Sequence, residues 1–151
     1  MSMNMGWMEK RQFERVDAAI KVSYRVIPKS ELVRHLTDSA YRESTTDRLP
    51  ELSKKSPTMH AVTKDISMGG LSLFGETEFP PDSALEIFLY LPTYPSPITM
   101  IAEILRTQAS SSSTGELFRA GLKILAINKQ DINRLDRFLL AEKLRKHSGG
   151  T

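Results

Sequence analysis

The sequence predicts a mainly β fold, a six-stranded antiparallel barrel with a C-terminal α-helix. Six short segments alternate apolar and polar residues and are separated by turn residues. The sequence shows no alternation of strands and helices, the pattern that would predict a parallel sheet. A barrel fits better than a sandwich because closure removes exposed sheet edges. The 151 residues, 40% of them hydrophobic, are enough for one domain with its own core.

The strands follow from a period of two, which places alternate side chains on one face. The first is expected at Ala18 to Ile27, where Ile20, Val22, Tyr24 and Val26 alternate with polar residues. The other five are expected at His60 to Asp65, Leu71 to Phe74, Ala84 to Leu91, Ile98 to Thr107 and Phe118 to Ala126. A serine-rich hairpin tip is expected over 110–115, and Arg119 and Lys123 should face outward from the last strand.

Three further segments complete the predicted organisation. Residues 1–18 are a polar, methionine-rich and basic arm, expected to be mobile because it has few apolar anchors. Residues 19–127 form the barrel, interrupted by an insertion over 28–59 with a short helix at about 30–42 and a polar loop over 43–58. Residues 128–148 form the C-terminal helix. Asn128 and Asp131 resemble a capping pair at the start of this helix. The helix should dock on the barrel through an apolar stripe formed by Ile132, Leu135, Phe138 and Leu139.

Composition excludes several classes of protein. With no cysteine there are no disulfides, thiolate zinc sites or cysteine nucleophiles, and the three scattered histidines lack metal-ligand spacing. No segment has the roughly 18 apolar residues of a membrane span, and the first ten residues lack the apolar centre of a secretion signal. We therefore expect a cytoplasmic protein without membrane insertion. The net charge of +3 permits an anionic partner but is too small to indicate DNA or RNA.

The densest group of functional residues lies between the second and third predicted strands. Asp65 and Ser67 are two residues apart, so an extended backbone places both side chains on one face. Gly69 and Gly70 follow, where the missing Cβ atoms allow positive φ and the close approach of a flat ligand. The same pattern also occurs as a turn in which the polar side chains bond only their own backbone.

Two arginines precede the first predicted strand with a spacing of four. Arg11 and Arg15, followed later by Asp65, Ser67 and Gly70, reproduce Arg-x-x-x-Arg and Asp-x-Ser-x-x-Gly in the same order. In both motifs the chain resembles the PilZ domain family, from about Glu9 through the C-terminal helix. The resemblance implies a small bacterial β-barrel that binds the second messenger cyclic di-GMP, with no other cofactor. The insertion over 28–59 is longer than the family usually carries between its motifs.

These residue types suit a cyclic dinucleotide of guanine. An arginine fork can donate to guanine O6 and N7, pair with phosphate or stack on a base. The resemblance places Arg11 and Arg15 on guanine and phosphate, Asp65 and Ser67 on base and backbone, and Gly69 and Gly70 at the point of access. Lys10 adds a basic residue at a position where the family varies, which favours a stacked pair of ligands. Further basic candidates for the rim of the site are Arg106, Arg119 and Lys123.

Three kinds of function compete on the sequence. The first is a cyclic di-GMP receptor that changes shape and signals to an effector protein controlling motility, pili or exopolysaccharide. The second is a protein-interaction adaptor with the same barrel that binds no nucleotide, and the third is an RNA-binding small barrel. The third lacks aromatic residues at stacking spacing apart from Phe88 and Tyr90. We expect no enzyme, since the sequence has no glycine-rich phosphate loop and no nucleophile beside a histidine.

Overall fold

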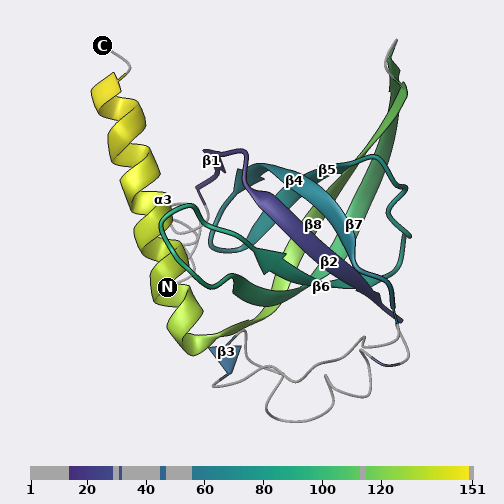
Figure 1. Ribbon diagram of the computed structural model, residues 1–151, viewed down its shortest axis with the longest axis horizontal. Helices are drawn as coiled ribbons and strands as arrows, with labels where there is room; N and C mark the ends of the chain where they lie inside the picture. The colour runs from purple at the N-terminus through teal and green to yellow at the C-terminus, as the bar shows by residue number, and fades with distance from the viewer. Residues whose placement is uncertain (1–13, 29–30, 32–44, 47–55, 113–114, 150–151) are drawn as a thin grey trace, which may run out of the picture.

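The computed structural model describes residues 14–28, 31, 45–46, 56–112 and 115–149. Six strands form a closed ring: β2 (Lys21–Ile27), β4 (Met59–Ile66), β5 (Gly70–Gly75), β6 (Ala84–Leu89), β7 (Ile98–Ser112) and β8 (Gly115–Asn128). The order is β4-β2-β6-β7-β8, and β5 closes the ring by pairing with both β8 and β4. Every pair in this ring is antiparallel. The predicted six-stranded antiparallel barrel with a C-terminal helix is therefore confirmed (Figure 1).

Two short strands lie outside the ring and were not predicted. Strand β1 (Val16–Asp17) pairs antiparallel with β4, so the end of the N-terminal arm is joined to the barrel. Two residues of the arm over 1–18, which we expected to be mobile, are thus paired with the barrel. Strand β3 (Thr45–Thr46), inside the expected polar loop, pairs parallel with β8. Residues 1–13 of the arm lie outside the described residues, as does the helix expected at 30–42 apart from Glu31.

The hairpin of β7 and β8 is longer than predicted. Strand β7 runs to Ser112 and β8 begins at Gly115, so most of the expected serine-rich tip is paired strand. In Figure 1 this hairpin projects beyond the barrel on the side away from the C-terminal helix. The serines contribute backbone hydrogen bonds although their side chains give no hydrophobic alternation, which explains why the pattern missed them.

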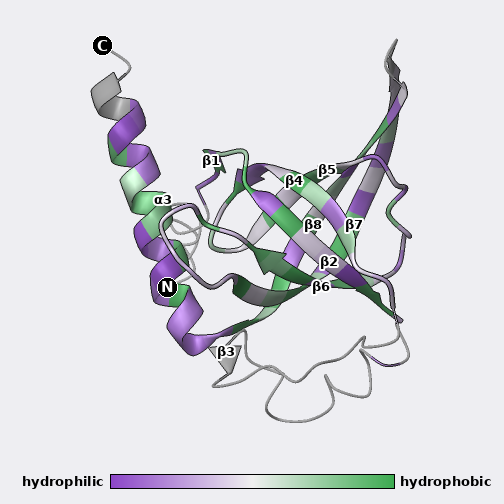
Figure 2. Cartoon of the chain, in the orientation of Figure 1, coloured by the Kyte–Doolittle hydropathy of each residue, from purple (hydrophilic) through white to green (hydrophobic). Residues whose placement is uncertain are grey.

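The main core fills the barrel. One residue in two on each strand points inward, and the largest side chains that are fully buried there include Tyr24, Phe79, Leu71, Leu73, Leu85 and Ile87. Figure 2 shows hydrophobic residues recurring along the barrel strands, whereas the helix is mainly hydrophilic with single hydrophobic residues. A second, smaller buried cluster comprises Ile27, Ala84, Ile101 and Ala126. Burial on this scale is the dominant stabilising contribution.

Helix α3 (Lys129–Gly149) docks beside the barrel as the sequence predicts. Leu135, Phe138 and Leu139 of its apolar stripe are buried. At its first turn, Asp131 Oδ2 accepts a hydrogen bond from the backbone N–H of Thr99 on β7 at 3.2 Å, and Asp131 Oδ1 accepts one from Arg134 at 2.8 Å. The start of the helix is thus bonded to the barrel wall. Among the described residues, no helix combines the length and apolar character needed to cross a membrane.

Candidate functional site

The turn between β4 and β5 is held by the hydroxyl of Ser67. This oxygen accepts hydrogen bonds from the backbone N–H groups of Gly69 at 3.2 Å and Gly70 at 3.1 Å, and donates one to the Gly70 carbonyl at 3.2 Å. Ser67 is also buried, with only 3% of its surface exposed. In this conformation the Ser67 hydroxyl bonds its own turn, which is one of the two arrangements that the sequence leaves open.

Gly70 is required by strand packing. A Cβ atom at this position would lie 2.3 Å from the Leu122 carbonyl oxygen of β8, far closer than any real contact. Among the described residues, positive φ at glycine occurs at Gly115, so neither Gly69 nor Gly70 takes the left-handed conformation that the sequence suggested. The absent side chain of Gly70 thus lets β5 approach β8.

Arg15 and Asp65 meet directly. Arg15 Nη1 donates to Asp65 Oδ1 at 2.6 Å and to the hydroxyl oxygen of Ser72 at 3.3 Å. The side chain of Asp65 is only 10% exposed, whereas that of Arg15 is 50% exposed. Across the described residues, the remaining nitrogens of this guanidinium, Nε and Nη2, make no further hydrogen bond. The structure therefore unites the second arginine of the first motif with the carboxylate of the second motif.

Strand β1 fixes the backbone on which Arg15 stands. Val16 pairs with Ile66 and is 4% exposed, so a buried apolar side chain follows the arginine. Helix α3 contacts the same segment, because Lys146 Nζ donates to the Asp17 carbonyl and Lys143 lies 3.6 Å from the Glu14 carboxylate. The position of Arg15 consequently depends on both β4 and α3.

A row of outward-facing residues continues from Asp65 across three more strands. The register pairs Asp65 with Ser72, Ser72 with Gly121 and Gly121 with Arg106. Residues paired in an antiparallel sheet project to the same side, so these side chains share the outer wall of the barrel. Ser72 and Gly121 are small, and the side chain of Arg106 lies over Gly121, where a Cβ would be 3.1 Å from its Nε.

Arg119 lies one register row further along β8. It pairs with Phe74, and its guanidinium carbon is 5.7 Å from the centre of the Phe74 ring. Arg119, Arg106 and Gly121 line a hollow of about 300 Å³ together with Thr107 and Gln108. We call the outer wall that carries Arg15, Arg106 and Arg119, with Ser72 and Gly121 between them, the arginine face. It presents three guanidinium groups around small residues, an arrangement suited to a planar anionic ligand.

The other predicted site residues lie in different places. Lys123 is exposed and faces outward, as predicted, but its register partners are Gly70 and Glu103, and the carboxylate reduces the local positive charge. Lys10 and Arg11 lie outside the described residues. Sequence reasoning missed Ser72 and Gly121. The alternation of side chains along a strand could have revealed them, because residues two apart share a face. Ser72 is two residues beyond Gly70, and Gly121 lies midway between the basic residues Arg119 and Lys123 of β8.

Within the described ranges, no three histidine or acidic side chains gather in a way that could hold a metal ion. The arginine face therefore remains the strongest candidate site among the described residues. Its partners would be anions and planar rings.

Comparison with known proteins identifies the class to which this barrel belongs. The family model of the PilZ domain matches residues 9–141, so the chain is a member of the PilZ domain family. The match begins within the arm and spans the barrel and most of α3. No curated protein matches the chain.

Solved structures share the fold at low sequence identity. The PilZ domain with c-di-GMP of YcgR from Escherichia coli has a TM-score of 0.57 and 12% identity, over 94% of this chain and 98% of that one. MotI/DgrA, an inhibitor of motility from Bacillus subtilis, has a TM-score of 0.58 and 18% identity, over 90% of this chain and 52% of that one. MrkH of K. pneumoniae in its apo state has a TM-score of 0.62 and 16% identity, over 91% and 52%. This chain thus spans about half the length of the MotI and MrkH chains.

Proposed function

We propose that this protein is a cytoplasmic receptor for cyclic di-GMP that binds the nucleotide on the arginine face. The observation that supports this most strongly is the 2.6 Å contact between Arg15 Nη1 and Asp65 Oδ1. It joins one residue from each of the two motifs that define the family resemblance. The family match over 9–141 and the likeness to the YcgR domain with c-di-GMP support the choice of ligand.

The chemistry of the face matches the ligand. Cyclic di-GMP carries two phosphates, and Arg15, Arg106 and Arg119 supply three cations that remain charged at any physiological pH. Arg15 uses Nη1 for Asp65 and Ser72, which leaves Nε and Nη2 for a guanine edge or a phosphate. Asp65 can accept from guanine N1 and N2, which no arginine can do. The hydrogen bond from the half-exposed Arg15 holds this largely buried carboxylate in one orientation before the ligand arrives.

The output of binding would be a change in the N-terminal arm that an effector protein detects. A ligand that bonds Arg15 competes with Asp65 for its guanidinium, and the same backbone segment is bonded to α3 through Lys146 and Lys143. Such a differential contact is what a ligand needs to shift a conformational equilibrium. The effector would act in motility, pilus function or exopolysaccharide synthesis. In this account the protein is a receptor without catalytic activity.

Isothermal titration calorimetry with cyclic di-GMP tests the proposal. The wild type should bind, and Arg15→Ala or Asp65→Ala should each weaken binding by about tenfold or more, since each removes a charge-assisted hydrogen bond. Glu116→Ala is a suitable control because this carboxylate is exposed near the tip of the β7–β8 hairpin. Wild-type affinity in the Arg15→Ala variant would refute the assignment of the site.

A second candidate function is a PilZ adaptor that binds protein but no nucleotide. One observation favours it: Asp65 and Ser67, both motif residues, already have hydrogen-bond partners within the protein. Hydrogen exchange distinguishes the two. An adaptor would show protection on addition of its protein partner and none on addition of cyclic di-GMP, whereas a receptor would show protection of β4 and β5 with the nucleotide alone.

A further inference from the structure

An apolar groove lies on the outer barrel wall next to the arginine face. Its volume is about 700 Å³, in the range of small-ligand sites, and it runs over β2, β4 and β5 to Leu117 near the tip of the β7–β8 hairpin. Val62 and Leu117 line it and are 41% and 40% exposed. Neither Arg15 nor Asp65 lines this groove, so the ligand contacts proposed for these two residues leave it unoccupied.

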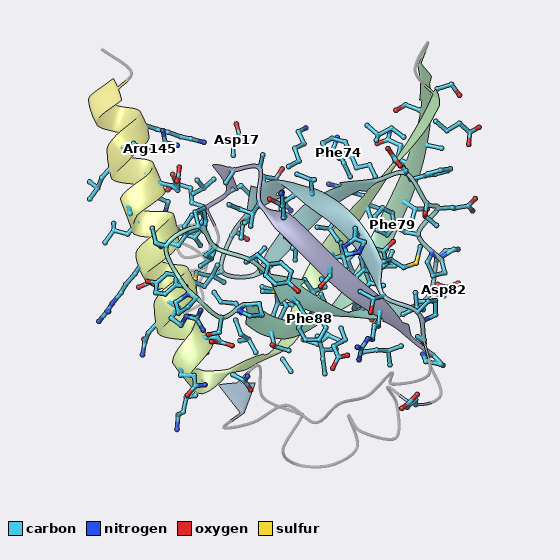
Figure 3. All side chains as sticks on the ribbon, in the orientation of Figure 1. Asp17, Phe74, Phe79, Asp82, Phe88 and Arg145 are labelled. Atoms are coloured by element: carbon cyan, nitrogen blue, oxygen red, sulfur yellow. The ribbon has the colours of Figure 1, made fainter. Side chains whose placement is uncertain are left out.

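The groove and the arginine face are continuous through Phe74 and Arg119. Phe74 is the next outward residue after Ser72 on β5, one register row away, which corresponds to about 7 Å along the strand. Its ring lines the groove and lies under the guanidinium of Arg119, which lines the hollow of the arginine face. In Figure 3, Phe74 lies beside β5 on the side of the barrel away from α3. A ligand on the arginine face would thus have an aromatic surface beside it.

The rim of the groove carries groups that complement the edge of a guanine. Glu76 continues the outward parity of Ser72 and Phe74 just beyond the end of β5, and its carboxylate can accept from guanine N1 and N2. Lys21 and His60 line the groove from β2 and β4, and a side-chain N–H of either can donate to guanine O6 or N7. All three are exposed.

We infer that this groove binds the second guanine of the cyclic dinucleotide, with Phe74 as the stacking surface and Glu76 as the group that selects guanine. The inference rests on the proposed function, since Arg15 and Asp65 would hold the first guanine and the phosphates. The two bases of one ligand would then occupy adjacent register rows of the same barrel wall. Both bases contribute to specificity, and the groove sets the preference for a second guanine over an adenine.

Calorimetry with cyclic di-GMP and the mixed 3′,3′-cyclic GMP–AMP tests the inference. The mixed ligand can place its guanine at Asp65, but its adenine has no N1–H and no N2 amine for Glu76. The wild type should therefore prefer cyclic di-GMP by about tenfold. Glu76→Gln should remove most of this preference and leave the affinity for the mixed ligand unchanged, whereas Glu78→Gln, a matched charge change outside the groove, should preserve the preference.

Phe74→Leu provides a second variant that keeps an apolar side chain. It should weaken both ligands by about tenfold, because stacking does not depend on which base is present. If the wild type binds cyclic di-GMP while Glu76→Gln and Phe74→Leu bind both ligands as the wild type does, the groove assignment is overturned and the receptor function stands. If the wild type binds no cyclic di-GMP, the receptor function and the groove assignment both fail.

Discussion

Replacing Gly70 by alanine tests whether this glycine serves strand packing or ligand access. The new Cβ would lie 2.3 Å from the Leu122 carbonyl oxygen, whereas ordinary contacts begin at 3.4 Å, so β5 and β8 would have to separate by about 1 Å. The obstacle is backbone inside a paired ladder, where Gly70 is opposite Lys123. We therefore expect Gly70→Ala to cost about 3 kcal/mol of unfolding free energy, the upper end for overpacking.

Chemical and thermal denaturation measure this cost, which corresponds to a fall in melting temperature of about 8 °C for a chain of this size. Gly121→Ala is the matched control on the neighbouring strand. Its Cβ would meet Arg106 Nε at 3.1 Å, and because that contact is part of a flexible side chain, it can move at little cost. Equal stability of Gly70→Ala and the wild type would refute the close approach of β5 to β8.

Three further predictions concern the supports of the site and the core. A double-mutant cycle of Arg15→Ala and Asp65→Ala, measured by denaturation, should give a coupling of about 1 kcal/mol in unfolding free energy. The value is small because the arginine is half exposed and solvent screens the pair. Purely additive effects of the two substitutions would show that the contact does not stabilise the fold. Leu135→Ala should lower the unfolding free energy by about 3 kcal/mol because this residue of α3 is fully buried in the core. Leu140 is 57% exposed, so Leu140→Ala should change the unfolding free energy by less than about 0.5 kcal/mol, and similar losses for both variants would contradict the docking of the helix. Burial raises the pKa of the Tyr24 phenol, so the folded state keeps the phenol proton at a pH where the unfolded state loses it. The unfolding free energy should therefore fall as the pH rises above the pKa of the unfolded state, near 10. Urea titrations should show a smaller fall with pH for Tyr24→Phe than for the wild type.

The sequence predicted the elements that bury one face of a regular pattern. Alternation located β4 to within one residue at each end and β8 to within three, because each inward side chain enters the core. The helix α3, Lys129–Gly149, lies within one residue of the predicted 128–148 at each end for a similar reason, since its apolar stripe docks on the barrel. By contrast, β1 and β3 have two residues each, too few to show any period.

The candidate site was predicted in part. Local motif spacing identified Arg15 and Asp65, and the structure brings them together although 50 residues separate them. The role of Ser67 was not predictable, since the same residues can bond a ligand or their own turn, and the outcome depends on the geometry of the β4–β5 connection. The contribution of Gly121 depends on the register of β8 against β5 and β7, which a single sequence does not reveal.

The most direct measurement of the central claim is a titration of the isotope-labelled protein with cyclic di-GMP, followed by amide chemical shifts in heteronuclear NMR. If the ligand binds the arginine face, the amide chemical shifts of Asp65, Ser72 and Gly121 should change together and reach their limiting values over the same range of ligand concentration. Amides in the docked part of α3 around Leu135, which is fully buried, should shift less. No shifts at saturating ligand, or shifts that spare β4, β5 and β8, would contradict the proposal that the two motifs form one nucleotide site.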